Sequence, residues 1–182
     1  MNNLVEIIAA IFSLLSVVFA VKNNIFTWPF AMVGVIFYGL FFYENHIWGN
    51  MFLQIPFFIQ AIYGWRKWDL IQDDKVEWLE KRDRNILVIS SLLLTTIITY
   101  ILIITGDKSP YFDGITTSFS LIAMTLLAKR KIDTWLYWIV ADILFIIFFV
   151  NEEQYLSSIT YFVFLILAIT GLKQWKKNIK TV

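Results

Sequence analysis

The chain has 182 residues, of which 59% are hydrophobic and 16% charged, with a formal net charge of +1 and no cysteine. Whole stretches carry no charge, which excludes a water-soluble domain, because each helix of such a domain needs a polar face. The absence of cysteine excludes disulfides, iron–sulfur clusters and thiol catalysis. The balanced charge gives no indication of a nucleic-acid partner.

Seven stretches are apolar enough to cross a bilayer, which takes roughly 17–25 residues of helix. In chain order they are Leu4–Val21, Phe26–Tyr43, Ile47–Trp65, Ile86–Thr105, Tyr111–Ala128, Thr134–Val150 and Tyr155–Leu172. A strongly charged segment, 66–84, separates the third from the fourth. The first stretch has no basic residue before it, so we expect it to be part of the fold and not a signal peptide.

The chain also contains an internal duplication. Shifted by 107 positions, residues 4–68 align with 111–175 without a gap, and 18 of the 65 pairs are identical. A fixed period of this kind indicates a fold built from repeats. Two copies of a three-helix membrane unit are typical of transporters, with the substrate site where the copies meet.

The predicted fold is therefore an all-α integral membrane protein with seven transmembrane helices. Two parallel three-helix repeats are joined by a linker helix in a 3+1+3 plan, a SWEET-like architecture. The expected boundaries are 4–65 for the first repeat, 66–84 for a charged cytoplasmic linker, 85–105 for the connecting helix, 111–172 for the second repeat and 173–182 for a cytoplasmic tail.

Lysine and arginine are distributed very unevenly between the two ends of these spans. Of the 15 basic residues, 14 fall on one side of the predicted membrane, and Lys108 alone falls on the other. Positive charge marks the cytoplasmic side. The prediction is a multi-pass protein of a cytoplasmic membrane, with the N-terminus outside and the C-terminus in the cytoplasm.

The sixth span carries the first candidate site. Trp135, Trp138 and Asp142 are spaced i, i+3, i+7 and so share one helix face. Two indoles on one face can hold a flat ring, and a cationic ring adds cation–π attraction. An acid near mid-span is costly unless it faces water, a partner or a ligand. The alternatives are an interfacial position for Trp135 and a hydroxyl partner for Asp142. Trp28, the counterpart of Trp135 in the first copy, is a further candidate.

The third span carries the amides Asn50, Gln54 and Gln60. Amides are costly in lipid and are expected to face the bundle, where they either join helices or bind a polar part of a substrate. The repeat aligns Gln54 with Tyr161 of the seventh span, so polar groups recur at one depth in both copies.

Several motifs resemble the PnuC family of bacterial vitamin transporters. They are the 3+1+3 layout, Leu-Gln-Ile-Pro-Phe-Phe at 53–58, Tyr-Gly-Trp-Arg-Lys-Trp at 63–68, Thr-Trp-Leu-Tyr-Trp-Ile-Val at 134–140 and Gly-Leu-Lys-Gln-Trp at 171–175. The resemblance covers nearly the whole chain, and its most specific motif is the Trp-x-x-Trp formed by Trp135 and Trp138.

The resemblance implies uptake of nicotinamide riboside by facilitated diffusion, with trapping by a cytosolic kinase, and a homotrimer with one path in each protomer. It implies a ligand between the two tryptophans and polar residues of the third and seventh spans, here Gln54 or Gln60 and Thr160 or Tyr161. Relatives that carry thiamine or riboflavin remain an alternative, because paired indoles and Asp142 suit thiamine's thiazolium as well.

Other classes of function are disfavoured by the sequence. Nucleotide-binding and metal-ligand signatures and a nucleophile–base pair are absent, so we expect no catalytic residue, no metal and no cofactor. A sugar carrier of the SWEET or PQ-loop type would share the plan, but the chain lacks the Pro-Gln motif. A membrane sensor would need an output domain that these short loops do not provide. The expected partners are a small-molecule vitamin and the lipid bilayer.

Overall fold

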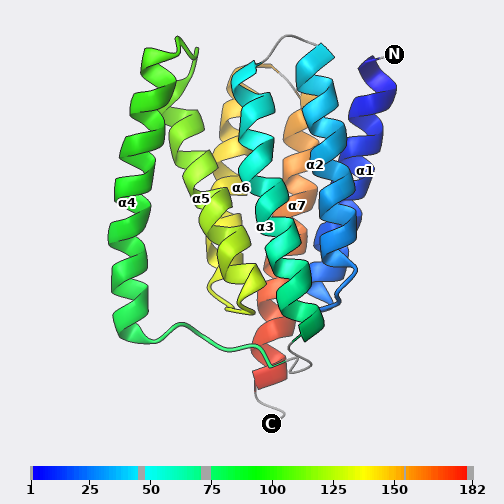
Figure 1. Cartoon of the computed structure of the whole chain (residues 1–182), viewed down its shortest axis with the longest axis vertical. Helices are drawn as coiled ribbons and strands as arrows, with labels where there is room; N and C mark the ends of the chain where they lie inside the picture. The colour runs from blue at the N-terminus through cyan, green and yellow to red at the C-terminus, as the bar shows by residue number, and fades with distance from the viewer. Residues whose placement is uncertain (1, 45–47, 71–74, 154, 180–182) are drawn as a thin grey trace.

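The structure is a computed structural model that describes residues 2–44, 48–70, 75–153 and 155–179. These residues form seven helices that run alternately along one axis, with the two termini at opposite ends of the bundle (Figure 1). The helices are α1 (Asn2–Val21), α2 (Thr27–Glu44), α3 (Trp48–Leu70), α4 (Lys81–Ile104), α5 (Pro110–Ala128), α6 (Thr134–Asn151) and α7 (Tyr155–Ile179). The predicted all-α fold is confirmed.

Five of the seven helices, as far as the structure describes them, are long and apolar enough to span a membrane: α1, α4, α5, α6 and α7. The predicted spans in α2 and α3 do not meet that criterion. α2 has Trp28 and Pro29 in its first turn and ends at Glu44, while α3 contains three amides, Pro56 and a charged last turn. These residues lower the mean hydropathy. Both helices still run the length of the bundle (Figure 1), where polar side chains can contact protein instead of lipid.

Six helices form a closed ring in the order α1, α2, α3, α5, α6, α7, with α7 packing back against α1. The helix α4 lies outside this ring and packs against α5 (Figure 1). Their close approach depends on Gly114, since a Cβ there would lie 2.0 Å from the Thr99 hydroxyl oxygen. Because α4 crosses the bundle once more, α5 begins at the same end as α1.

The helices α1 and α5 end in the same way. Asn23 and Arg130, 107 residues apart, both adopt a left-handed backbone with φ of 51° and 52°. In each case the next N–H donates to the carbonyl five residues back, at 3.0 and 2.9 Å, as in a Schellman motif. The Arg130 Nε also donates to the Asn23 Oδ1 at 3.2 Å. Each residue therefore contacts its own counterpart in the other copy. A local pseudo-two-fold axis passes between the two residues.

The charged segment 66–84 is only partly a loop. Its first residues continue α3 to Leu70, its last begin α4 at Lys81, and residues 75–80 cross one end of the bundle (Figure 1). Glu77 forms a parallel β-bridge with Lys131, in which the Glu77 N–H donates to the Arg130 carbonyl at 3.3 Å. Val76 beside it is buried. The 75–80 segment is thus docked on the turn between α5 and α6.

Candidate functional site

Four tryptophans form two matching pairs at the end of the bundle that carries the 75–80 segment. Trp28 of α2 meets Trp68 of α3 edge to face at a centroid distance of 5.2 Å, and Trp135 of α6 meets Trp175 of α7 at 5.4 Å. Together with small and aliphatic neighbours they form the main buried cluster of the bundle. The duplication in the sequence therefore corresponds to a duplicated packing unit.

Each tryptophan pair forms a hydrogen bond with the other three-helix copy. The Trp68 Nε1 donates to the Ala128 carbonyl at the end of α5 at 3.1 Å, and the Trp175 Nε1 donates to the Val21 carbonyl at the end of α1 at 3.2 Å. Residues 21 and 128 are again 107 apart, so the two hydrogen bonds are reciprocal. They close the ring where α3 meets α5 and where α7 meets α1.

Trp28 and Trp135, both predicted to contact a ligand, are fully packed in this structure, with 0% and 1% of their surface exposed. Each ring lies directly on a glycine: a Cβ at Gly64 would come within 2.4 Å of Trp28, and one at Gly171 within 2.5 Å of Trp135. Their indole N–H groups are buried without a hydrogen-bond partner among the described residues. A buried donor of this kind needs a water or a ligand group to satisfy it.

Trp138 and Asp142 follow Trp135 along the predicted face of α6. Trp138 is half-buried and packs against the tryptophan cluster. Asp142 lies one turn further into the helix and is 4% exposed. Trp138 is thus the residue of the Trp-x-x-Trp motif that keeps accessible ring surface.

Tyr161 of α7 lies at the level of Asp142. Its ring stacks on Phe145 of α6 at 4.2 Å, and it lies within electrostatic range of the carboxyls of Asp142 and Asp113. Thr160 beside it is half-buried. Asp142 of α6 thus has Trp138 one turn away on its own helix and Tyr161 of α7 within electrostatic range.

The α3 amides have separate surroundings. The Gln60 Nε2 donates to the Leu121 carbonyl at 2.9 Å and to the Thr125 hydroxyl at 2.8 Å, so it joins α3 to α5. Its Oε1 is buried without a hydrogen-bond partner in the described part of the chain. Gln54 is half-buried beside Gly39 of α2, and the side chain of Asn50 lies outside the described residues. Gln60 thus joins α3 to α5 through its Nε2, while its Oε1 can accept a hydrogen bond from a ligand or a water.

Several residues that hold this site in place lie outside the predicted site. Gly64, Gly171, Trp68 and Trp175 were visible as identical pairs of the alignment, and that identity was the signal for a shared packing role. Asp133, which holds the 75–80 segment, had no such signal, because its counterpart in the first copy is Phe26. Among the described residues, no group of three His, Cys, Asp or Glu side chains could hold a metal ion.

A family model described as "Nicotinamide mononucleotide transporter" matches residues 3–177. The chain belongs to this family, the PnuC family. The nicotinamide riboside transporter PnuC of Escherichia coli strain K12 is 22% identical over 201 residues, covering 94% of this chain and 84% of that protein. The PnuC of Neisseria mucosa is 27% identical over 189 residues, covering 95% of this chain and 72% of that protein.

A solved structure described as "Crystal structure of the Vitamin B3 transporter PnuC" has the same fold. Its TM-score is 0.81 at 24% identity, over 98% of this chain and 83% of that one. The chain is accordingly a multi-pass membrane protein of a transporter family with the PnuC fold. The family resemblance seen in the motifs is confirmed.

Proposed function

We propose that this PnuC chain takes up nicotinamide riboside by facilitated diffusion and that a cytosolic kinase traps the product. Two relatives, covered by this chain over 84% and 72% of their length, carry nicotinamide riboside in their names. The observation that carries the proposal is the pairing of half-buried Trp138 with buried Asp142 one turn away on α6, with Tyr161 of α7 within electrostatic range of that acid. It places an accessible indole next to a buried acid, which suits a flat cationic ring.

Each part of the ligand has a partner of suitable chemistry in this arrangement. The pyridinium ring would stack on Trp138, with cation–π attraction, and Trp135 would support that indole from behind. Asp142 would balance the positive charge. The buried Gln60 Oε1 would accept a hydrogen bond from the carboxamide or a ribose hydroxyl. Gln54, Asn50, Thr160 and Trp28 remain proposed contacts along the same path.

The proposed architecture is two parallel three-helix repeats joined by α4, in the 3+1+3 plan shared with SWEET carriers. The reciprocal tryptophan hydrogen bonds and the Asn23–Arg130 contact support it. The proposed orientation places the N-terminus outside and the docked 75–80 segment in the cytoplasm, because the sequence assigns 14 of the 15 basic residues to the side of that segment. The proposed assembly is a homotrimer with one path in each protomer.

Calorimetric titration of the purified protein with nicotinamide riboside, thiamine, riboflavin and a sugar tests the substrate. We expect saturable binding of nicotinamide riboside that weakens in Trp138→Ala. Stronger binding of thiamine or riboflavin would replace the proposed substrate by another vitamin. Binding of the sugar alone would contradict the vitamin-transporter proposal.

A further inference from the structure

A groove opens at the end of the bundle that carries the 75–80 segment. It has a volume of about 470 Å³ and is lined by Trp78 of that segment and by Lys173, Lys176, Lys177 and Ile179 of α7. That volume lies in the range of small-molecule sites. The groove is separate from Trp138 and Asp142 and has no part in the transport site proposed above.

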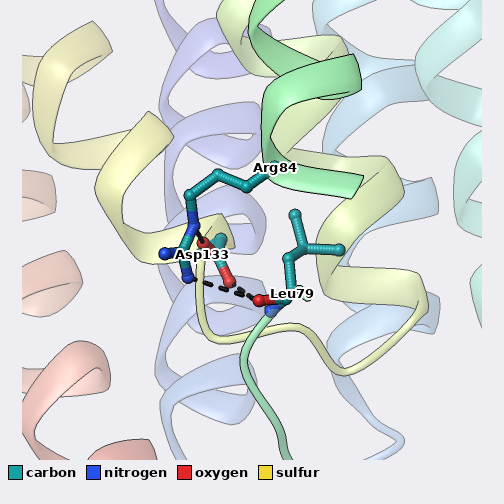
Figure 2. Close-up of polar contacts among 3 residues, drawn as sticks. All are labelled: Leu79, Arg84 and Asp133. Atoms are coloured by element: carbon teal, nitrogen blue, oxygen red, sulfur yellow. Dashed lines mark hydrogen bonds and ion pairs between the residues drawn. The ribbon is translucent and has the colours of Figure 1, made fainter. Parts of the chain in front are cut away.

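One wall of the groove is an aromatic ring in a fixed position. Trp78 packs against the tryptophan cluster inside the ring of helices. The residue after it is anchored, because the Leu79 N–H donates to the Asp133 Oδ2 at 2.8 Å. Arg84 of α4 donates from its Nε to the other carboxylate oxygen at 2.9 Å (Figure 2). The Arg84 guanidinium also lies over the Trp78 ring, 5.7 Å from its centre, so the indole is held in a fixed orientation.

The opposite wall concentrates positive charge. Lys173, Lys176 and Lys177 are spaced i, i+3, i+4 and so share one face of α7. The Lys176 Nζ lies 5.3 Å from the centre of the Trp78 ring. Lys173 and Lys176 carry like charges one turn apart, and an anion beside them would relieve their repulsion.

This arrangement is specific to the second copy. The positions 107 residues earlier are Arg66, Asp69 and Leu70, whose formal charges sum to zero. The orientation of a membrane protein depends on the total positive charge near its cytoplasmic ends, and it does not require three lysines around one aromatic ring. The asymmetry therefore indicates a local role for the groove.

We propose that this groove binds a soluble ligand that combines a phosphate with a flat ring, namely a nucleoside monophosphate. The ring would stack on Trp78 and the lysines would hold the phosphate. Because Trp78 packs inside the ring of helices, the groove lies beneath the bundle and not on its lipid-facing side. This placement favours a soluble phosphate over a lipid headgroup.

Calorimetry on the full chain in uncharged detergent tests this proposal with nicotinamide mononucleotide, adenosine monophosphate, nicotinamide riboside and inorganic phosphate. Both nucleotides should bind more tightly than phosphate, and their affinity should fall as salt is added. Lys176→Gln should weaken both by about threefold to fivefold, the effect of one partly exposed charge pair. Lys129→Gln, which removes an exposed charge from the same end of the bundle, should leave them unchanged.

Binding of nicotinamide riboside should be the same in Lys176→Gln as in the unmodified chain. The proposal for the groove can therefore be refuted independently of the proposal for the transport site. Equal nucleotide affinity in Lys176→Gln and the unmodified chain would overturn the proposal. A second arm compares nanodiscs of zwitterionic lipid with nanodiscs containing phosphatidylglycerol. Lysine-dependent retention of the anionic lipid without nucleotide binding would assign the groove to a headgroup and also overturn it.

Discussion

At the residue scale, the two tryptophans of the Trp-x-x-Trp motif differ in what surrounds them. Trp135 is sealed between Gly171 and Trp175, with 1% of its surface exposed. Trp138 is half-buried and lies one turn from Asp142. Trp138 therefore retains exposed ring surface in this structure, whereas contact of a ligand with Trp135 requires the cluster to open.

Trp138→Ala is expected to weaken ligand binding by roughly 1–3 kcal/mol, the range for a lost stacking and cation–π partner. Trp138→Phe should lose less, because a smaller aromatic face remains. Calorimetric titration of the purified variants measures the difference. Trp65→Ala is the matched control, since Trp65 is 44% exposed on α3. Unchanged affinity in a folded Trp138→Ala protein would rule out stacking on this residue.

Gly171→Ala and Gly64→Ala are expected to destabilise the protein by about 1–3 kcal/mol each, because the added methyl group would overlap a packed indole ring. Gly39→Ala in α2 is the matched control. A Cβ there would meet the nearest atom, the Gln54 Cγ, at 3.9 Å, an ordinary contact. Thermal unfolding in detergent measures the three variants. A melting temperature that falls as much for Gly39→Ala as for Gly171→Ala would contradict the proposed packing role.

The sequence predicts residue positions on a helix face well, because that face depends on local periodicity alone. Trp138 and Asp142 share a face of α6 as expected. The partners of Gln60 could not be predicted, because they depend on which helix lies next to α3. The sequence left open whether Trp135 lies at the membrane interface or contacts a ligand, and its full burial in the core, which rules out the interfacial position, depends on neighbours that periodicity does not reveal.

At the scale of the elements, the 75–80 segment is held by the β-bridge at Glu77, by buried Val76 and by one acidic side chain from the α6 end of the turn. Asp133 accepts from the Leu79 N–H and from the Arg84 guanidinium, and its own side chain is 3% exposed. The sequence predicts a charged linker here, because its composition is polar. Its docking depends on a contact with a residue some fifty positions away, which composition does not reveal.

Asp133→Ala is expected to cost about 1–3 kcal/mol of stability, because the Leu79 N–H and the Arg84 guanidinium lose their acceptor. Arg84→Gln should cost less, about 1 kcal/mol or below, since Arg84 is 48% exposed. The expected signs are a lower melting temperature and faster proteolysis of the 75–80 segment. Asp83→Ala, which removes an acid in the first turn of α4, is the control. Equal proteolysis of Asp133→Ala and Asp83→Ala would show that this contact does not hold the segment.

At the scale of the whole molecule, hydrophobic periodicity and the 107-residue repeat were sufficient to predict seven helices. The order of the helices in the ring was not predicted, because the alignment pairs residues of the two copies without saying which helices touch. Charge distribution predicts the orientation. A reporter that is active only in the cytoplasm should work when fused after Val182 and stay silent at the N-terminus; the reverse pattern would refute this orientation.

Asp142→Asn is expected to retain counterflow exchange of nicotinamide riboside in liposomes, with weaker binding of the cationic ligand. A single deep acid without a basic partner is a poor proton relay, so its charge should affect affinity more than energy coupling. Exchange rates and Kd values of the variant and the unmodified chain provide the measurement. Complete loss of exchange in a folded Asp142→Asn protein would instead give Asp142 an essential role in translocation.

Uptake of labelled nicotinamide riboside into liposomes containing the purified chain tests the proposed function most directly. Uptake should exceed that of empty liposomes, compete with excess unlabelled substrate and stop when the inside and outside concentrations are equal. A nicotinamide riboside kinase and ATP enclosed in the liposomes should then drive further accumulation of label. Uptake no faster than in empty liposomes would contradict transport of this substrate. Accumulation above the outside concentration without kinase, under an imposed pH or sodium gradient, would contradict facilitated diffusion.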